Sequence, residues 1–157
     1  MKLLLFVLGF LVTNLVQAEQ DNKDWRQSGT NEEKLDNVIR VIPSAADIMF
    51  QMGERYRNLY WAGKQGKWKF ARYQTEEMQR LVKNLMLTRP NRATTAKTFL
   101  HDAFEGYEQA IQQKDWAKFQ AAFEHMRERC IACHIQNEHA FVILNKHPAK
   151  GNSPVLD

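Results

Sequence analysis

Proline and glycine are scarce in this chain, and so are cysteines and long apolar runs. Its 157 residues include four prolines, seven glycines and two cysteines. Two cysteines exclude the disulfide framework that holds many small secreted domains together. The rest of the chain is rich in Ala, Glu, Lys, Gln, Arg, Met and Leu, which are strong helix formers. The composition therefore predicts an all-α protein.

Positive charge is in modest excess and is not concentrated in one segment. The formal net charge is +4, from 22 Lys and Arg against 18 Asp and Glu, spread along the chain. Nucleic-acid-binding proteins usually gather their basic residues on one face or in one stretch. We therefore expect no nucleic-acid partner.

The long apolar run that the chain does contain lies at its N-terminus. A basic residue is followed by the apolar run 3–12, and Val16 and Ala18 are small residues at the two positions that signal peptidase reads. We predict an export signal at 1–18 and a mature chain that starts at Glu19. An uncleaved membrane anchor is the alternative, and it is disfavoured because the run is short for a bilayer span. After signal cleavage we expect no membrane association, since no later segment approaches transmembrane length.

The two cysteines are three residues apart and are followed at once by a histidine, as Cys130-Ile131-Ala132-Cys133-His134. Cys-x-x-Cys-His is the attachment signature of c-type haem. On a helix, a spacing of three places both sulfurs on one face, where they can form thioethers with the two vinyl groups of one porphyrin. The histidine can then bind the iron. The motif predicts one covalent haem c, held by Cys130 and Cys133, with His134 as the proximal iron ligand.

Three other uses of a Cys-x-x-Cys pair fit this chain less well. A thiol–disulfide catalyst normally lies at a strand-to-helix junction, and no convincing strand is expected here. A structural zinc site needs four ligands, and His139 is off the helical face of His134. A disulfide within a helix would close a very short and strained loop. Haem c is attached outside the bacterial cytoplasm, so the motif and the export signal together predict a periplasmic protein.

Apolar residues recur at steps of three and four in four stretches of the chain, which is the pattern of amphipathic helices. The first helix should begin after Pro43, because Ser44 and Asp47 have the spacing of an N-terminal capping box, and it should end at Gly63. Asp115 should cap the fourth helix. The second, third and fourth helices are expected at 67–87, 93–112 and 116–145.

Short turns join these expected helices, and their simplest arrangement is an antiparallel four-helix bundle over residues 44–146. Before the bundle we expect a mobile polar leader at 19–43, which ends in a short turn or helix around 35–41. After the bundle, 147–157 should form an irregular tail.

In both motif and architecture, the chain resembles the cytochrome c-prime-like class of monohaem cytochromes. Members of that class are periplasmic four-helix bundles with the Cys-x-x-Cys-His motif in the last helix, and here Cys130 falls inside the fourth expected helix. The resemblance covers roughly residues 43–145. The class often has a basic residue after the motif, whereas Ile135 and Gln136 follow it here. This departure concerns the charge around the exposed haem edge and not the attachment.

The resemblance implies that the first helix supplies the residue on the distal side of the iron. A methionine there makes a six-coordinate electron carrier, whereas an apolar or aromatic residue leaves an open site for small gases. Met49 is our preferred distal ligand and Met52 the alternative, although either can be a packing residue. Phe123, Met126 and Phe141 are expected to line the porphyrin from turns near the motif.

The function expected from these features is that of an exported monohaem c-type cytochrome. It would carry single electrons between redox partner proteins and would not be an enzyme in its own right. Two alternatives remain at this stage: a five-coordinate haem protein that binds NO or CO, and an interaction or sensor module whose haem tunes association. Trp61, Trp68 and Tyr73 can pack in the core or form the face of a homodimer.

Overall fold

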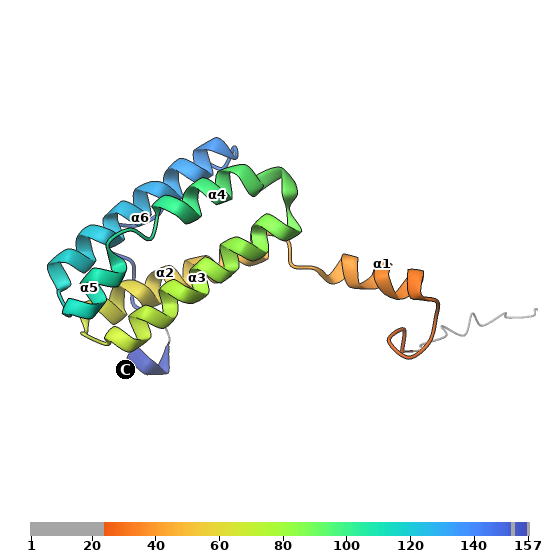
Figure 1. Ribbon diagram of the computed structural model, residues 1–157, viewed down its shortest axis with the longest axis horizontal. Coiled ribbons are helices and arrows are strands. Elements are labelled where there is room, and N and C mark those ends of the chain that lie inside the picture. The colour runs from red at the N-terminus through yellow and green to blue at the C-terminus, as the bar shows by residue number, and fades with distance from the viewer. Residues whose placement is uncertain (1–23, 152, 157) are drawn as a thin grey trace, which may run out of the picture. The chain divides into compact units, whose positions relative to one another are not determined.

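The computed structural model describes residues 24–151 and 153–156, and all regular structure in this part of the chain is helical (Figure 1). The expectation of an all-α protein is confirmed for these residues. The predicted signal at 1–18 lies outside them. Among the described helices, none is both long enough and apolar enough to cross a bilayer. The chain divides into two compact units, Met1–Val41 and Ile42–Asp157.

The first unit contains one described helix, α1 (Asn31–Val41). The backbone N–H of Glu33 donates to Oγ1 of Thr30, and the Glu33 carboxylate accepts from the backbone N–H of Thr30. This capping box starts the helix earlier than the turn or helix expected around 35–41. No residue of α1 is buried.

The second unit begins with two long helices, α2 (Ala45–Lys64) and α3 (Trp68–Thr88), which pack along each other (Figure 1). The predicted start of α2 is confirmed. Ser44 Oγ accepts from the backbone N–H of Asp47, and the Asp47 carboxylate accepts from the backbone N–H of Ser44. The chain reverses after α2 at Gly66, whose φ of +68° is in the left-handed region that glycine adopts without strain.

The helix expected at 93–112 is wrong as a single element, because two shorter helices occupy this stretch. A 3₁₀ turn at Pro90–Arg92 leads into α4 (Ala93–Asp102), and α5 (Tyr107–Gln113) follows. Gly106 separates the two with a φ of +82°, a conformation that a helix cannot contain.

The last long helix, α6 (Trp116–Gln136), starts where the sequence predicts but ends well before Asn145. The Asp115 carboxylate accepts from the backbone N–H of Lys118, which confirms the predicted cap. At the other end, Asn137 Nδ2 donates to the carbonyl of Cys133 at 2.7 Å, and Glu138 has a φ of +66°. A helix commonly ends where a side chain donates to one of its last carbonyls, and where the next residue takes the left-handed conformation.

The core of the second unit lies where these helices meet. The α6 helix packs against α2, α4 and α5, while α3 packs against α4 and α5. Trp61 and Trp68 are half-buried against this core, and Tyr73 is 49% exposed. The most deeply buried large side chains are Leu59, Met78, Phe119, Phe123, Met126 and Leu156.

Candidate functional site

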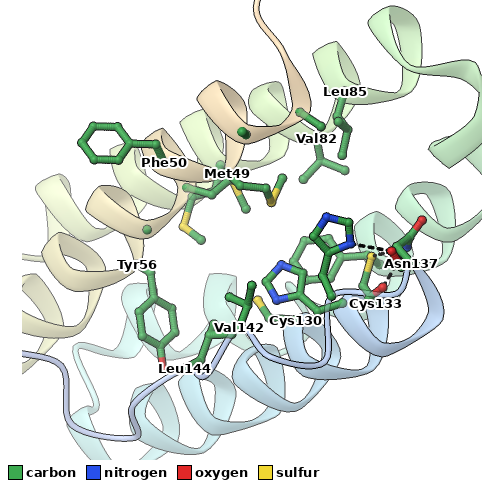
Figure 2. Close-up of a pocket in the computed structure, with 18 of the residues that line it drawn as sticks. Met49, Phe50, Tyr56, Val82, Leu85, Cys130, Cys133, Asn137, Val142 and Leu144 are labelled. Atoms are coloured by element: carbon green, nitrogen blue, oxygen red, sulfur yellow. Dashed lines mark hydrogen bonds between the residues drawn. The ribbon is translucent and has the colours of Figure 1, made fainter.

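A cavity of about 660 Å³ lies in the second unit (Figure 2). Its walls come from α2, α3, α4, α6 and the stretch 139–149, which we call the C-terminal segment. Most of the lining side chains are apolar, among them Val82, Leu85 and Phe99. Cavities of this size and character are typical of sites for small organic ligands and cofactors.

The three residues of the Cys-x-x-Cys-His motif that carry chemistry all line this cavity. They come from the last two turns of α6, where Cys130 is 8% exposed and Cys133 and His134 are half-buried. Both cysteines are free thiols. The helix thus brings two thiols and one imidazole to the wall of one cavity, as their spacing predicts.

The environment of the thiols is unlike that of a thiol–disulfide catalyst. Burial raises the pKa of Cys130 to about 12. Burial also raises the pKa of Cys133, although a hydrogen bond with Thr95 and the charge of Arg92 partly oppose the rise. Catalytic cysteines need a lowered pKa, because the thiolate is the nucleophile. A redox-catalytic use of this pair is therefore disfavoured.

His134 is held as a neutral imidazole with an unused nitrogen. Burial lowers its pKa, and the nearby His139 adds to this effect. Its Nδ1 atom is buried and has no hydrogen-bond partner among the described residues. A buried polar atom without a partner costs free energy, and a neutral imidazole is the form that binds metals. This nitrogen is therefore available to bind a ligand in the cavity.

The opposite wall of the cavity belongs to α2. Figure 2 shows Met49 across the cavity from Cys130 and Cys133. Met52, which is 7% exposed, also lines it. A further thioether comes from Met78 of α3, which sequence analysis did not assign to the site.

The three residues expected to line the porphyrin are placed differently. Phe123 and Met126 are fully buried on α6, but they lie behind the cavity surface rather than on it. Phe141 does not lie on α6 and is 77% exposed, so its expected position in the fourth helix, a turn or two from the motif, is wrong. The physical reason is the early end of α6 at Gln136.

The C-terminal segment supplies a wall that the sequence does not predict. Val142 and Leu144 of this segment line the cavity together with Cys130 (Figure 2). The hydroxyl of Tyr56, a cavity residue of α2, donates to the carbonyl of Asn145 at 2.7 Å. Sequence analysis treated residues 139–145 as the end of the fourth helix, because their apolar residues continue the helical spacing.

Asn137 is a second residue at the site that sequence reasoning did not single out. Its Nδ2 atom donates to Thr95 Oγ1 at 2.9 Å and lies 3.6 Å from Cys133 Sγ, while its Oδ1 accepts from Arg92 at 2.9 Å. These contacts fix the second cysteine against the start of α4. An amide four residues after Cys133 is the signal that could have identified it, since it can reach the carbonyl of that cysteine.

The function of this site is argued from the chemistry of its own residues. Comparison of the chain with protein-family models, curated proteins and solved structures finds no match. Within the described residues, no three or more His, Cys, Asp or Glu side chains are grouped so that they could hold a metal ion by themselves. The cavity instead gathers two thiols, an imidazole and, on other helices, methionine thioethers.

Proposed function

We propose that the chain is an exported monohaem c-type cytochrome that carries single electrons and is not an enzyme in its own right. Cys130 and Cys133 would hold haem c, and His134 would bind its iron. One observation carries the proposal: these three side chains line one largely apolar cavity, and Nδ1 of His134 is buried without a partner. When bound, the haem supplies reversible one-electron exchange at its iron.

Attachment needs no oxidant. Each thiol would add across a vinyl double bond, so that its sulfur bonds to one vinyl carbon and its hydrogen passes to the other. Burial and the raised pKa make Cys130 a poor nucleophile in the folded chain. We therefore expect attachment to precede closure of the cavity, during maturation after export.

A methionine of α2 would complete the iron coordination. Met49 remains the preferred ligand and Met52 the alternative, and both line the wall of the cavity formed by α2. Thioether ligation stabilises the reduced iron and raises its potential, which suits electron transfer. The proposed signal at 1–18 would place the mature chain in the periplasm, where redox partner proteins would exchange electrons with it.

The finer architecture is part of the same proposal. We propose an antiparallel four-helix bundle of the cytochrome c-prime-like type, in which α4 and α5 together take the third position. The packing of α3 on both of these short helices, and of α6 on α2, α4 and α5, supports this arrangement. The motif then lies in the last helix, as in that class.

Absorption spectra of the oxidised and reduced protein test the electron-carrier assignment. A one-electron titration with low-spin spectra in both states, and a reduced form that binds carbon monoxide poorly, are expected. His134→Ala should abolish or alter these spectra. His101, whose side chain is 88% exposed, provides the control, and His101→Ala should leave the spectra unchanged. A high-spin protein that binds carbon monoxide or nitric oxide directly would instead favour the gas-binding alternative. A colourless protein from a host that attaches c-type haem would overturn both the electron-carrier and the gas-binding assignments.

A further inference from the structure

The C-terminal segment forms one wall of the cavity, but little apolar burial holds it there. Val142 and Leu144 line the cavity (Figure 2), and so does Ile143. Ile143 is nevertheless 84% exposed, and Pro148 is the one buried residue of this fully described segment. Stretches with few buried apolar contacts are the ones that open locally at low cost in free energy. This wall can therefore leave while the helices stay packed.

Side chains of α2 hold the segment by its backbone. The hydroxyl of Tyr56 donates to the carbonyl of Asn145 at 2.7 Å, and Nε1 of Trp61 donates to the carbonyl of Pro148 at 2.9 Å. Each hydrogen bond of this kind contributes modestly to stability, because water replaces the partner when the bond breaks. The segment is thus held closed by a few separate bonds that can break and form again.

Both ends of the segment are fixed, so it is a strap and not a free tail. Before it, Asn137 donates to Oγ1 of Thr95 at 2.9 Å. After it, a Cβ atom on Gly151 would lie 2.6 Å from Oδ1 of Asn58, so the chain rests closely on α2 at this point. Leu156, which is 1% exposed, then anchors the chain in the core.

The segment also passes the part of α6 that carries the first cysteine. Arg127, one turn before Cys130, donates to the carbonyl of Leu144 at 3.4 Å. Cys130 is 8% exposed, so joining a bulky group to its sulfur requires a wall of the cavity to move. The helical walls share one close-packed core, and moving them would unpack it. The C-terminal segment is the wall that can move alone.

We infer that the C-terminal segment is a strap that opens from the cavity as one unit while the helices stay folded. Opening exposes Cys130 and admits a bulky ligand. On closing, Tyr56 and Trp61 bind the carbonyls of the segment again. The inference deepens the proposed function and rests on it only for the identity of the ligand, a haem.

The test measures alkylation of Cys130 by iodoacetamide in the haem-free full chain, so that its outcome does not depend on haem. A Cys133→Ser background leaves Cys130 as the only thiol. When closing is faster than the reaction, the rate follows the opening equilibrium. Trp61→Phe should raise the rate about twofold to tenfold, the effect of one lost hydrogen bond. Trp61 does not line the cavity, so this effect reaches Cys130 through the segment.

Trp68→Phe is the matched control for Trp61→Phe. Trp68 is also half-buried against the core, but it packs on Phe119 and not on the segment. This variant should leave the alkylation rate unchanged. An equal rise in both variants, or no rise in Trp61→Phe, overturns the inference.

Two further measurements test whether the segment opens as one unit and locally. Tyr56→Phe combined with Trp61→Phe should multiply the two single effects, because one opening breaks both bonds. The alkylation rate should also rise less steeply with urea than the unfolding equilibrium does, since a local opening uncovers little surface. A rate that follows global unfolding overturns the strap.

Failure of the strap and failure of the proposed function are distinguishable. A chain that acquires no haem in a host that attaches c-type haem, but passes these tests, would overturn the cytochrome proposal and leave the strap standing. A haem-loaded cytochrome whose haem-free chain fails them would overturn the strap alone.

Discussion

Gly63 of α2 lies so close to Phe119 of α6 that a Cβ atom at position 63 would overlap the phenylalanine ring. Both residues are buried, and Phe119 is fully enclosed. Sequence analysis expected Gly63 to end its helix, but α2 continues to Lys64, so the glycine serves the close approach of two helices instead. The contact joins two of the helices that line the cavity, at the end of α2 farthest from it.

Gly63→Ala should therefore destabilise the protein. The added methyl group must displace a ring that has no free space around it, and overpacking of this kind costs about 1–3 kcal/mol. The free energy of unfolding from urea denaturation measures the loss.

Gly53→Ala is the matched control in the same helix. Nothing in the chain lies within 4 Å of a Cβ at Gly53, and alanine favours a helix interior over glycine. Because Gly53 lines the cavity, both variants are compared in the haem-free chain. This variant should be as stable as the unmodified protein or slightly more so. If Gly63→Ala were equally well tolerated, the close packing of α2 on α6 at this point would be wrong.

The capping box of α2 should make stability depend on pH. Hydrogen bonds from the Ser44 side chain, and then from its backbone, lower the pKa of Asp47 from its ordinary value of 3.8. Because the folded pKa lies below the unfolded one, this contribution is fully present above the unfolded pKa and is lost as the pH falls through the folded pKa.

A double-mutant cycle measures the contribution of the Asp47 carboxylate to the stability of the cap. Ser44→Ala should cost about 1 kcal/mol at neutral pH, the usual value for an N-cap. Its coupling to Asp47→Ala, measured by urea denaturation, should be clear at pH 7 and should shrink below pH 3.8. A coupling that is the same at both pH values would mean that the carboxylate does not take part in the cap.

The sequence predicts those parts of the fold that local chemistry determines. The starts of α2 and α6 follow from side chains that cap the first turn, Ser44 with Asp47 and then Asp115, and these need no information from elsewhere in the chain. The end of α6 was missed because Phe141 and Leu144 continue the helical spacing, while Asn137 and the left-handed Glu138 end the helix first.

The candidate site also has a part that the sequence predicts and a part that it does not. The wall formed by α6 is predictable, since a spacing of three residues on a helix places Cys130 and Cys133 on one face. The walls formed by Val82 and Leu144 are not predictable, because they depend on how α3 and the C-terminal segment pack against a distant part of the chain. Phe123 and Met126 are expected to line the porphyrin but lie buried behind the cavity surface, because helical spacing cannot separate a cavity surface from the core behind it.

Met49 and Met52 are distinguished by their effect on the iron. If Met49 is the distal ligand, Met49→Ala should convert a low-spin iron to a high-spin iron that binds carbon monoxide readily and has a lower potential. Met52→Ala should leave the spectrum low-spin and destabilise the core by about 2–5 kcal/mol. The reverse pattern would assign the ligand to Met52. Optical spectra and a redox titration of both variants provide the readout.

Removal of the haem should loosen the second unit. A cavity of about 660 Å³ between the helices would lose the group that fills it. We expect the haem-free chain to keep its helical far-ultraviolet dichroism and to unfold over a broad range at lower temperature than the loaded protein. An equally sharp and equally high thermal transition in the two forms would indicate that the haem lies outside the core.

The mass of the exported protein under denaturing conditions tests the central claim most directly. In a host with c-type haem maturation, the account predicts a chain heavier by one haem, with neither Cys130 nor Cys133 open to alkylation. Noncovalent haem would be lost under these conditions, so retention reports the two thioether bonds themselves. A chain at its unmodified mass, with both thiols alkylated, would contradict the account.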